Sequence, residues 1–288
     1  MAHSRLATPG ATIDVLRAHG IQTRKSLGQH FLVDDNVVGR TLALADLTGD
    51  EVVLEIGPGI GTLTVALCET AGAVVAVERD RRLLEVLADT TAACAGLTVV
   101  HADAVNVSAA DLLTPLGPPA ALVANLPYAV AATVVLRSFE IMPSLRFAVV
   151  MVQAEVADRM AASPGGKDYG AYTVKLHLRA RPAGRFAVPP GCFLPPPRVD
   201  SAVIRLDRID APASPEEIRA ASQVAEAAFA QRRKTLRNSM RSVLGTAPEA
   251  LDTALEAAGI DGGRRAETLE VPEFLRLGQV ALRYGLLP

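Results

Sequence analysis

From Glu51 onward, short runs rich in Val, Ile, Leu and Ala alternate with segments long enough to form helices. This alternation is typical of strand–helix repeats that build a parallel sheet with helices on both faces. Because the runs are apolar almost throughout, each strand is expected to be covered on both sides. The sequence therefore predicts an α/β fold. The predicted strands are Val52–Ile56, Val74–Val77, Thr98–His101, Leu122–Ala124, Ala148–Val152, Thr173–Leu178 and Ala202–Leu206.

The character of the sequence changes at Ala211–Pro215, after which strand-like runs disappear. Ser214 is a predicted N-cap, Pro215 the first helical residue and Glu217 the capping-box partner. We predict a larger domain over residues 1–210, beginning with a flexible segment at 1–25, and a small all-α domain over residues 211–288. Further helix boundaries are predicted at Gly245, Pro248, Gly259 and Pro272.

Composition narrows the classes of protein that this chain can belong to. The formal net charge of −2 means that any binding of nucleic acid must come from local basic patches rather than from the overall field. The apolar segments are strand-sized and the amino terminus does not resemble a signal peptide, so we expect a cytoplasmic protein with no membrane partner. The widely spaced Cys68, Cys94 and Cys192 predict neither a disulfide framework nor a metal site.

A glycine-rich segment, Glu55–Gly61, follows the first predicted strand and precedes a helix-forming segment. Its glycines, Gly57, Gly59 and Gly61, allow the backbone to turn sharply and to approach a ligand closely. Open α/β sheets bind their ligands at this end of the strands. The spacing is GxGxG rather than GxGxxG, and Pro58 lacks an N–H that a pyrophosphate would use. Both features weigh against a dinucleotide.

Acidic residues end the next two predicted strands. Glu78 lies about 20 residues beyond the glycines, where an acidic residue commonly accepts hydrogen bonds from ribose hydroxyls. Asp103 follows the third strand in the same manner. Each acid alone is usually a helix cap or a solvated charge, but the ordered set of glycine loop and two acids predicts a nucleoside-containing ligand.

The segment Asn125–Tyr128, with the sequence Asn-Leu-Pro-Tyr, ends the fourth predicted strand on the same sheet edge as the glycine loop. The structural alternative is a turn with a capping Asn and a partly buried Tyr. Asn-Leu-Pro-Tyr after a GxGxG strand resembles the small-subunit ribosomal RNA adenine dimethyltransferases, and the resemblance covers nearly the whole chain. Other segments that match this family's motifs are Lys25–Leu32, Phe193–Ser201, Gln231–Ser239 and Arg265–Glu267.

The resemblance implies a Rossmann-like class I S-adenosylmethionine-dependent methyltransferase sheet with a small all-α C-terminal domain. It implies S-adenosylmethionine as cofactor, with Glu78 meeting its ribose and Asp103 its adenine. The implied substrate is two adjacent adenosines near the 3′ end of 16S rRNA, in the 30S subunit or its precursor, and we expect a monomer. The cofactor-binding residues are then Gln29, His30, Leu32, Glu55, Gly57, Gly59, Gly61, Glu78, Asp103, Ala104 and Asn125.

An adenine amine is a poor nucleophile because its lone pair is delocalised into the ring. The Asn125 side-chain oxygen and the Leu126 carbonyl are expected to accept its hydrogens and favour a pyramidal nitrogen, with Pro127 fixing that carbonyl. Tyr128 is expected to stack on the purine of a flipped-out nucleotide. In the family that the chain resembles, the Phe at the position of Phe193 packs against the target adenine. These five residues form the predicted catalytic site.

A basic cluster lies at the start of the predicted helical domain, and the segment between residues 232 and 241 contains no acid. Such a cluster is suited to phosphate contacts, although a charge run on a helix is often only a solvated face. The predicted RNA-binding residues are Arg198, Arg232, Arg233, Lys234, Arg237 and Arg241.

Two departures from the family pattern concern local substrate contacts. Ala129 stands where members often have a polar residue, and Ala154 where they often have a basic one. Three alternatives to the leading interpretation stay open. They are an Erm-type 23S rRNA adenine methyltransferase, a ribosome-assembly factor whose catalysis is dispensable or lost, and, more remotely, an NAD-dependent dehydrogenase.

Overall fold

The computed structural model describes residues 3–21 and 29–287 of the chain. It divides into two compact units, unit 1 (Met1–Ala157 and Pro182–Arg208) and unit 2 (Asp158–Arg181 and Ile209–Pro288). The sequence placed one boundary at residue 210, whereas the structure groups Asp158–Arg181 with the helical unit. Among the described residues, no helix has the length and apolar character needed to cross a membrane.

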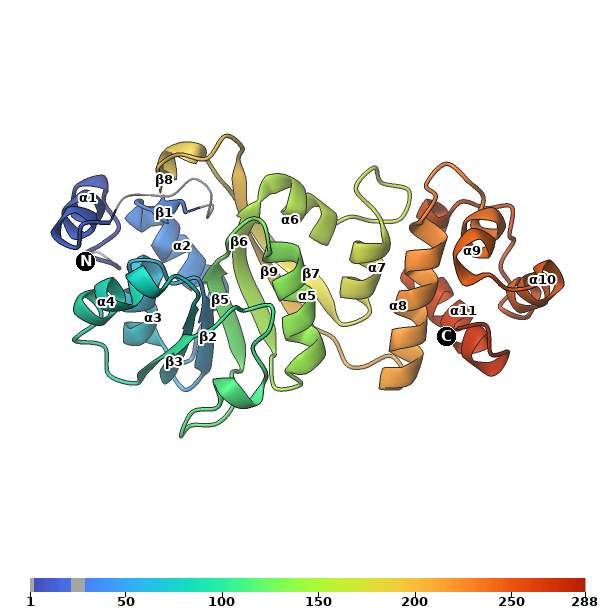
Figure 1. Cartoon of the computed structure of the whole chain (residues 1–288), viewed down its shortest axis with the longest axis horizontal. Helices are drawn as coiled ribbons and strands as arrows, with labels where there is room; N and C mark the ends of the chain where they lie inside the picture. The colour runs from blue at the N-terminus through green and yellow to red at the C-terminus, as the bar shows by residue number, and fades with distance from the viewer. Residues whose placement is uncertain (1–2, 22–28, 288) are drawn as a thin grey trace. The chain divides into compact units, whose positions relative to one another are not determined.

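A seven-stranded sheet forms the centre of unit 1, and its strands can be followed in Figure 1. Their order across the sheet is β4-β3-β2-β5-β6-β9-β7. The five strands from β4 to β6 are parallel, and β9 pairs antiparallel with β6, so the sheet is mixed. The strands are β2 (Val52–Ile56), β3 (Ala73–Glu78), β4 (Leu97–His101), β5 (Ala121–Asn125), β6 (Phe147–Gln153), β7 (Ala180–Val188) and β9 (Ser201–Arg208).

The α/β class and six of the predicted strands are confirmed, and one predicted strand is wrong. Thr173–Leu178 lies in helix α7 (Ala171–His177) and its cap. Val174 and Leu178 are four residues apart and both are buried in the core of unit 2, which a helix achieves on one face. The run alternates polar and apolar residues as a strand would. It is too short to distinguish the two-residue repeat of a strand from the 3.6-residue repeat of a helix.

Strands at the edges of the sheet differ from the expectation of full coverage. The side chains of β4, which is an edge strand, are half-buried or exposed. Strand β7 was not predicted from the sequence. It carries Arg181, Pro182, Gly184 and Arg185, and such residues are unfavourable in the interior of a sheet but tolerated in an edge strand.

Helices of unit 1 pack on this sheet and form its hydrophobic core. Val53, Val123 and Val149, on three neighbouring strands, are fully buried together with Val38 and Leu67. A short antiparallel pair of β1 (Phe31–Leu32) and β8 (Phe193–Leu194) lies outside the main sheet. The helices are α1 (Pro9–Ala18), α2 (Asp35–Ala45), α3 (Thr62–Thr70), α4 (Arg81–Thr90) and α5 (Ala131–Ile141), with α6 (Ala154–Met160) crossing the unit boundary.

The amino-terminal segment differs from the predicted flexible stretch at residues 1–25. Residues 3–21 are folded, and α1 begins at Pro9 with the Thr8 side chain accepting a hydrogen bond from the Ala11 N–H. The backbone N–H of Ser4 donates to Asp35 at 2.8 Å, and Leu16 is buried. The Thr-Pro start of the helix was a signal in the sequence that the prediction did not use.

Unit 2 is helical and has its own core. Its first long helix begins as predicted: Ser214 Oγ accepts from the Glu217 N–H at 3.2 Å, and the Glu217 carboxylate accepts from the Ser214 N–H at 2.9 Å. Gly245 ends a helix in the left-handed region, with φ of 63°. Besides α7, the helices are α8 (Pro215–Phe229), α9 (Leu236–Leu244), α10 (Pro248–Ala257) and α11 (Val271–Arg283).

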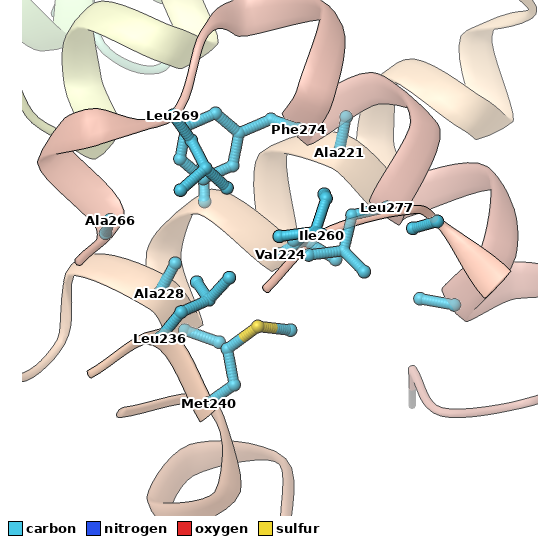
Figure 2. Packing of buried hydrophobic residues seen from close by; sticks show 14 of the residues in the cluster. Ala221, Val224, Ala228, Leu236, Met240, Ile260, Ala266, Leu269, Phe274 and Leu277 are labelled. Atoms are coloured by element: carbon cyan, nitrogen blue, oxygen red, sulfur yellow. The ribbon is translucent and has the colours of Figure 1, made fainter. Parts of the chain in front are cut away.

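Figure 2 shows the packing of this core. One cluster of buried side chains contains Phe274 and Leu277 of α11, Val224 of α8, and Leu236 and Met240 of α9. A β-carbon at Gly278 of α11 would lie 2.5 Å from the backbone nitrogen of Ala221. The absence of a side chain there therefore allows α11 to pack closely on α8.

We expect Gly278→Ala to lower the free energy of unfolding by about 1–3 kcal/mol, because the new methyl group would force the two helices apart. Urea denaturation of the full chain, followed by circular dichroism, measures this change. Gly10→Ala is the matched control, since Gly10 is also helical and has open space around it. A Gly278→Ala protein as stable as the wild type would contradict this explanation of the packing.

Candidate active site

The glycine loop after β2 is closely packed on both sides. Gly57, Gly59 and Gly61 have φ angles of 71°, 63° and 88°, which side chains rarely permit. A β-carbon at Gly57 would lie 3.2 Å from the Pro127 ring, and one at Gly59 would lie 3.3 Å from the Phe31 ring. The loop thus meets the Asn-Leu-Pro-Tyr segment on one side and the amino-terminal motif on the other.

The acidic residue at the end of β3 contacts the same loop. Glu78 is buried, and its carboxylate accepts hydrogen bonds from the backbone N–H groups of Asp80 at 2.7 Å and Gly59 at 3.3 Å. Burial raises the pKa of Glu78, and these backbone hydrogen bonds offset part of that effect. The structure therefore brings together the glycine loop and the first of the two predicted acids.

The second predicted acid lies beyond the next strand. His101 at the end of β4 pairs in register with Glu78 at the end of β3, so Asp103 follows at the same edge of the sheet. The Asp103 carboxylate accepts from the Val105 N–H at 3.0 Å and forms an ion pair with Arg79 at 3.3 Å. Ala104 beside it is half-buried.

Glu55, the first residue of the glycine-rich segment, is fully buried, and its Oε2 atom has no hydrogen-bond partner among the residues that the structure describes. Burial raises the pKa of this carboxyl to about 8, and the neighbouring Glu78 carboxylate contributes to the rise. An unpartnered buried carboxyl oxygen beside a glycine loop is an acceptor for a ligand donor such as an ammonium group. Together with the loop and Glu78, it fits S-adenosylmethionine, whose methionine amine and ribose hydroxyls are donors.

Asn125 is the last residue of β5, and its side chain is oriented by the amino-terminal motif. Its Nδ2 atom donates a hydrogen bond to the backbone carbonyl of His30 at 3.3 Å. Because a carbonyl oxygen only accepts, the Asn125 Oδ1 atom remains as an acceptor for another group. The next residue, Leu126, is buried, and its N–H donates to the Met151 carbonyl of β6 at 3.0 Å.

Tyr128 has a polar contact at one end and a ring contact on one face. Its hydroxyl lies 2.6 Å from Ser201 Oγ. The ring stacks on the imidazole of His30, with 5.6 Å between centroids and 26° between planes. Burial raises the pKa of the Tyr128 phenol, so the hydroxyl stays protonated around neutral pH.

The amino-terminal motif is only partly covered by the structure. Its first four residues, Lys25–Gly28, lie outside the described residues. Gln29 donates to Asp80 at 2.9 Å, and the Nδ1 atom of His30 donates to the Pro195 carbonyl at 2.8 Å. Leu32 is buried in β1 and pairs with Phe193 of β8.

The Phe193 ring is 3% exposed and belongs to the core of unit 1. Its contact with a target base stays a prediction. Three residues that the sequence analysis did not select also touch the site: Phe31 at the glycine loop, Asp80 beside Gln29 and Ser201 at Tyr128. Ser201 is the last residue of the Phe193–Ser201 motif, so the family resemblance could have identified it from the sequence.

The predicted RNA-binding residues are exposed in their respective units. Arg198 precedes β9 in unit 1, and the others belong to unit 2, in the turn before α9 and along that helix as far as its last turn. The Arg232 guanidinium donates to the Lys167 carbonyl, and Arg237 forms an ion pair with Asp252. Two of the basic side chains thus have partners within unit 2.

Comparison with known proteins gives consistent matches. A family model described as "Ribosomal RNA adenine dimethylase" matches residues 20–281. The chain is 41% identical to the "Ribosomal RNA small subunit methyltransferase A" of Geobacillus thermodenitrificans, covering 97% of this chain and 98% of the relative. It is 47% identical to the protein of the same name from Kineococcus radiotolerans, covering 89% and 85%.

Solved structures show the same fold. A dimethyladenosine transferase from Plasmodium falciparum is 22% identical, with a TM-score of 0.72 over 89% of this chain and 98% of that one. The 23S rRNA methyltransferase ErmE is 27% identical, with a TM-score of 0.63 over 87% and 98%. The sheet of unit 1 is thus of the class I methyltransferase type that the family resemblance implied.

The pKa of Glu55 predicts how stability depends on pH. Its ordinary value is 4.5 and its value in the fold is about 8, so folding favours the protonated carboxyl. This group contributes to the free energy of unfolding at low pH. The contribution, at most about 5 kcal/mol, is lost as the pH rises from about 5 to 8. We expect Glu55→Gln to become progressively more stable than the wild type over this range, measured by urea denaturation without ligand.

Glu51→Gln provides the control. Burial alone would raise the pKa of Glu51, but hydrogen bonds from Thr48 and Arg146 lower it overall. The contribution of Glu51 to the free energy of unfolding is lost only as the pH falls below the ordinary pKa of a glutamate. This variant should therefore be less stable than the wild type by a constant amount between pH 5 and 8. A constant difference for Glu55→Gln over the same range would refute the assigned pKa.

Proposed function

Because the chain belongs to the ribosomal RNA adenine dimethylase family, we propose that it dimethylates the N6 amines of two adjacent adenosines near the 3′ end of 16S rRNA. Membership of this family makes the chain an S-adenosylmethionine-dependent rRNA adenine dimethyltransferase. The choice of 16S rRNA rests on relatives that are 41% and 47% identical and bear the name of a small-subunit methyltransferase. We further propose that the substrate is the 30S subunit or its precursor, that the enzyme contributes to small-subunit biogenesis, and that it acts as a monomer in the cytoplasm.

The orientation of Asn125 is the observation in the structure that best supports methyl transfer to an adenine amine. Its Nδ2 atom is engaged by the His30 carbonyl, so Oδ1 is the atom available to a substrate. An adenine amine offers two hydrogens, which require acceptors. Before the first methyl transfer, Asn125 Oδ1 accepts one of these hydrogens and the Leu126 carbonyl accepts the other, which favours the pyramidal nitrogen whose lone pair is available. No strongly basic residue is needed, because the amine loses its proton after it has been methylated.

The cofactor site is assigned to the glycine loop and the acids around it. Glu78 and Asp103 would hold the nucleoside part, and Glu55 with the loop would hold the methionine part. When bound, S-adenosylmethionine supplies an electrophilic methyl group to the amine. The chain's own residues orient the base, accept its amine hydrogens and hold it in a pocket away from its neighbours in the RNA.

RNA binding is assigned to the basic cluster of unit 2, with Arg198 of unit 1. The cluster is exposed and has no acid within its own segment, so phosphate groups can approach it. The overall charge of −2 does not attract RNA, which makes this local patch the source of non-specific affinity. Base recognition is left to the Asn125–Tyr128 site.

Two alternatives have weaker support. An Erm-type 23S rRNA methyltransferase has the likeness to ErmE in its favour, but that likeness is 27% in identity, against 41% and 47% for the small-subunit relatives. The tight glycine loop and the oriented Asn125 weigh against an assembly factor that has lost its activity.

Incubation with labelled S-adenosylmethionine and unmethylated 30S particles should yield dimethyladenosine near the 3′ end of 16S rRNA. Asn125→Ala should lower the rate at least about a hundredfold, as loss of one preorganised hydrogen-bonding group does in other enzymes, while particle binding persists. Asn36→Ala, at an exposed position of α2, is the control. No product with 30S particles, or product with free 23S rRNA instead, would reject the proposed substrate.

The basic cluster predicts a change in salt dependence. Replacing both Arg233 and Lys234 by Ala should weaken binding to 16S rRNA fragments and reduce the slope of log affinity against log salt by about 1.5, because about two phosphate contacts are lost. Filter binding at several KCl concentrations measures the slope. Arg219→Ala, an exposed position on α8 outside the cluster, should leave it unchanged. An unaltered slope in the double variant would show that these exposed side chains, in the turn between α8 and α9, are only solvated.

A further inference from the structure

We propose that Ser201 is a positioning residue for methyl transfer, which acts by holding the Tyr128 ring through its hydroxyl. Ser201 is the first residue of β9 and is fully buried. Its Oγ lies 2.6 Å from the Tyr128 hydroxyl, and in the sheet it pairs with Gln153 at the end of β6. This inference rests on the proposed function, in which Tyr128 stacks on the target adenine.

The tyrosine ring is restrained from two directions. Its hydroxyl is tethered to Ser201, and one face is covered by the imidazole of His30. That imidazole is itself fixed, because its Nδ1 atom donates to the Pro195 carbonyl at 2.8 Å. A purine therefore has only the opposite face of Tyr128 on which to stack.

The tether links the plane of the ring to the reacting amine. The backbone of His30 accepts the hydrogen bond from Asn125, so His30 contacts both the group that holds the amine and the ring that supports the base. If the hydroxyl tether is lost, Tyr128 can rotate and the stacked adenine can tilt away from Asn125. The base would still bind, but its amine would less often be in the reactive geometry.

This role predicts a specific kinetic pattern. Ser201→Ala should lower kcat about fivefold, the size expected for one hydrogen bond, with KM for 30S particles changed by less than about twofold. The affinity for S-adenosylmethionine, measured by calorimetry, should be unchanged. Ser138→Ala, a buried serine of α5 in the same unit, is the matched control and should retain the wild-type kcat.

A double-mutant cycle with Tyr128→Phe separates positioning from general support of the fold. Tyr128→Phe removes the same hydrogen bond from the other side and should show the same fall in kcat. Adding Ser201→Ala to it should cause no further fall, because the bond is already absent. If Ser201→Ala does not fold, Tyr128→Phe alone tests the tether, and an unchanged kcat there would overturn the inference.

An unchanged kcat in folded Ser201→Ala would also overturn it, as would a further fivefold fall in the double variant. Those results presuppose a wild-type chain that methylates 30S particles. Lack of wild-type methylation would instead be a failure of the proposed function, so the two failures are distinguishable.

Discussion

The hydrogen bond from Asn125 Nδ2 to the His30 carbonyl decides what the end of β5 can do chemically. A side-chain amide has a donor end and an acceptor end, and an amine substrate with two hydrogens requires the acceptor. The amino-terminal motif occupies the donor end and leaves Oδ1 for the substrate. A residue 95 positions away in the chain thereby sets the orientation of the group on which the proposed mechanism depends.

The parallel strands make this contact possible because they end at one edge of the sheet. There the glycine loop after β2 is held against Pro127 and Phe31 with no space for side chains. The same compactness buries Glu55, whose carboxyl has an unpartnered oxygen and a pKa raised to about 8. Such a group destabilises the fold at neutral pH, and a ligand that donates a hydrogen bond to it relieves that cost. In the proposed cofactor site, stability and cofactor binding are therefore coupled at this residue.

Local signals were sufficient for the centre of the sheet and for the start of α8. Strands β2, β5 and β6 are apolar runs, and the Ser214 capping box is contained in four residues. Local signals were insufficient where a short run fits both the helical and the strand repeat, as at Thr173–Leu178. They were also insufficient where an edge strand carries charges, as in β7. Motifs in the sequence predicted Asn125 and Tyr128 as site residues. The pairing of Tyr128 with Ser201, 73 residues away, is set by tertiary structure, and no local pattern contains it.

A crystal structure of the chain with S-adenosylhomocysteine and an RNA fragment containing the target adenosines tests the central claim most directly. The quantity to measure is the distance from the adenine N6 atom to Asn125 Oδ1 and to the Leu126 carbonyl. Our account predicts a flipped base with N6 within hydrogen-bond distance of both oxygens. A base bound elsewhere, or an Asn125 amide that presents its nitrogen to the base, would contradict it.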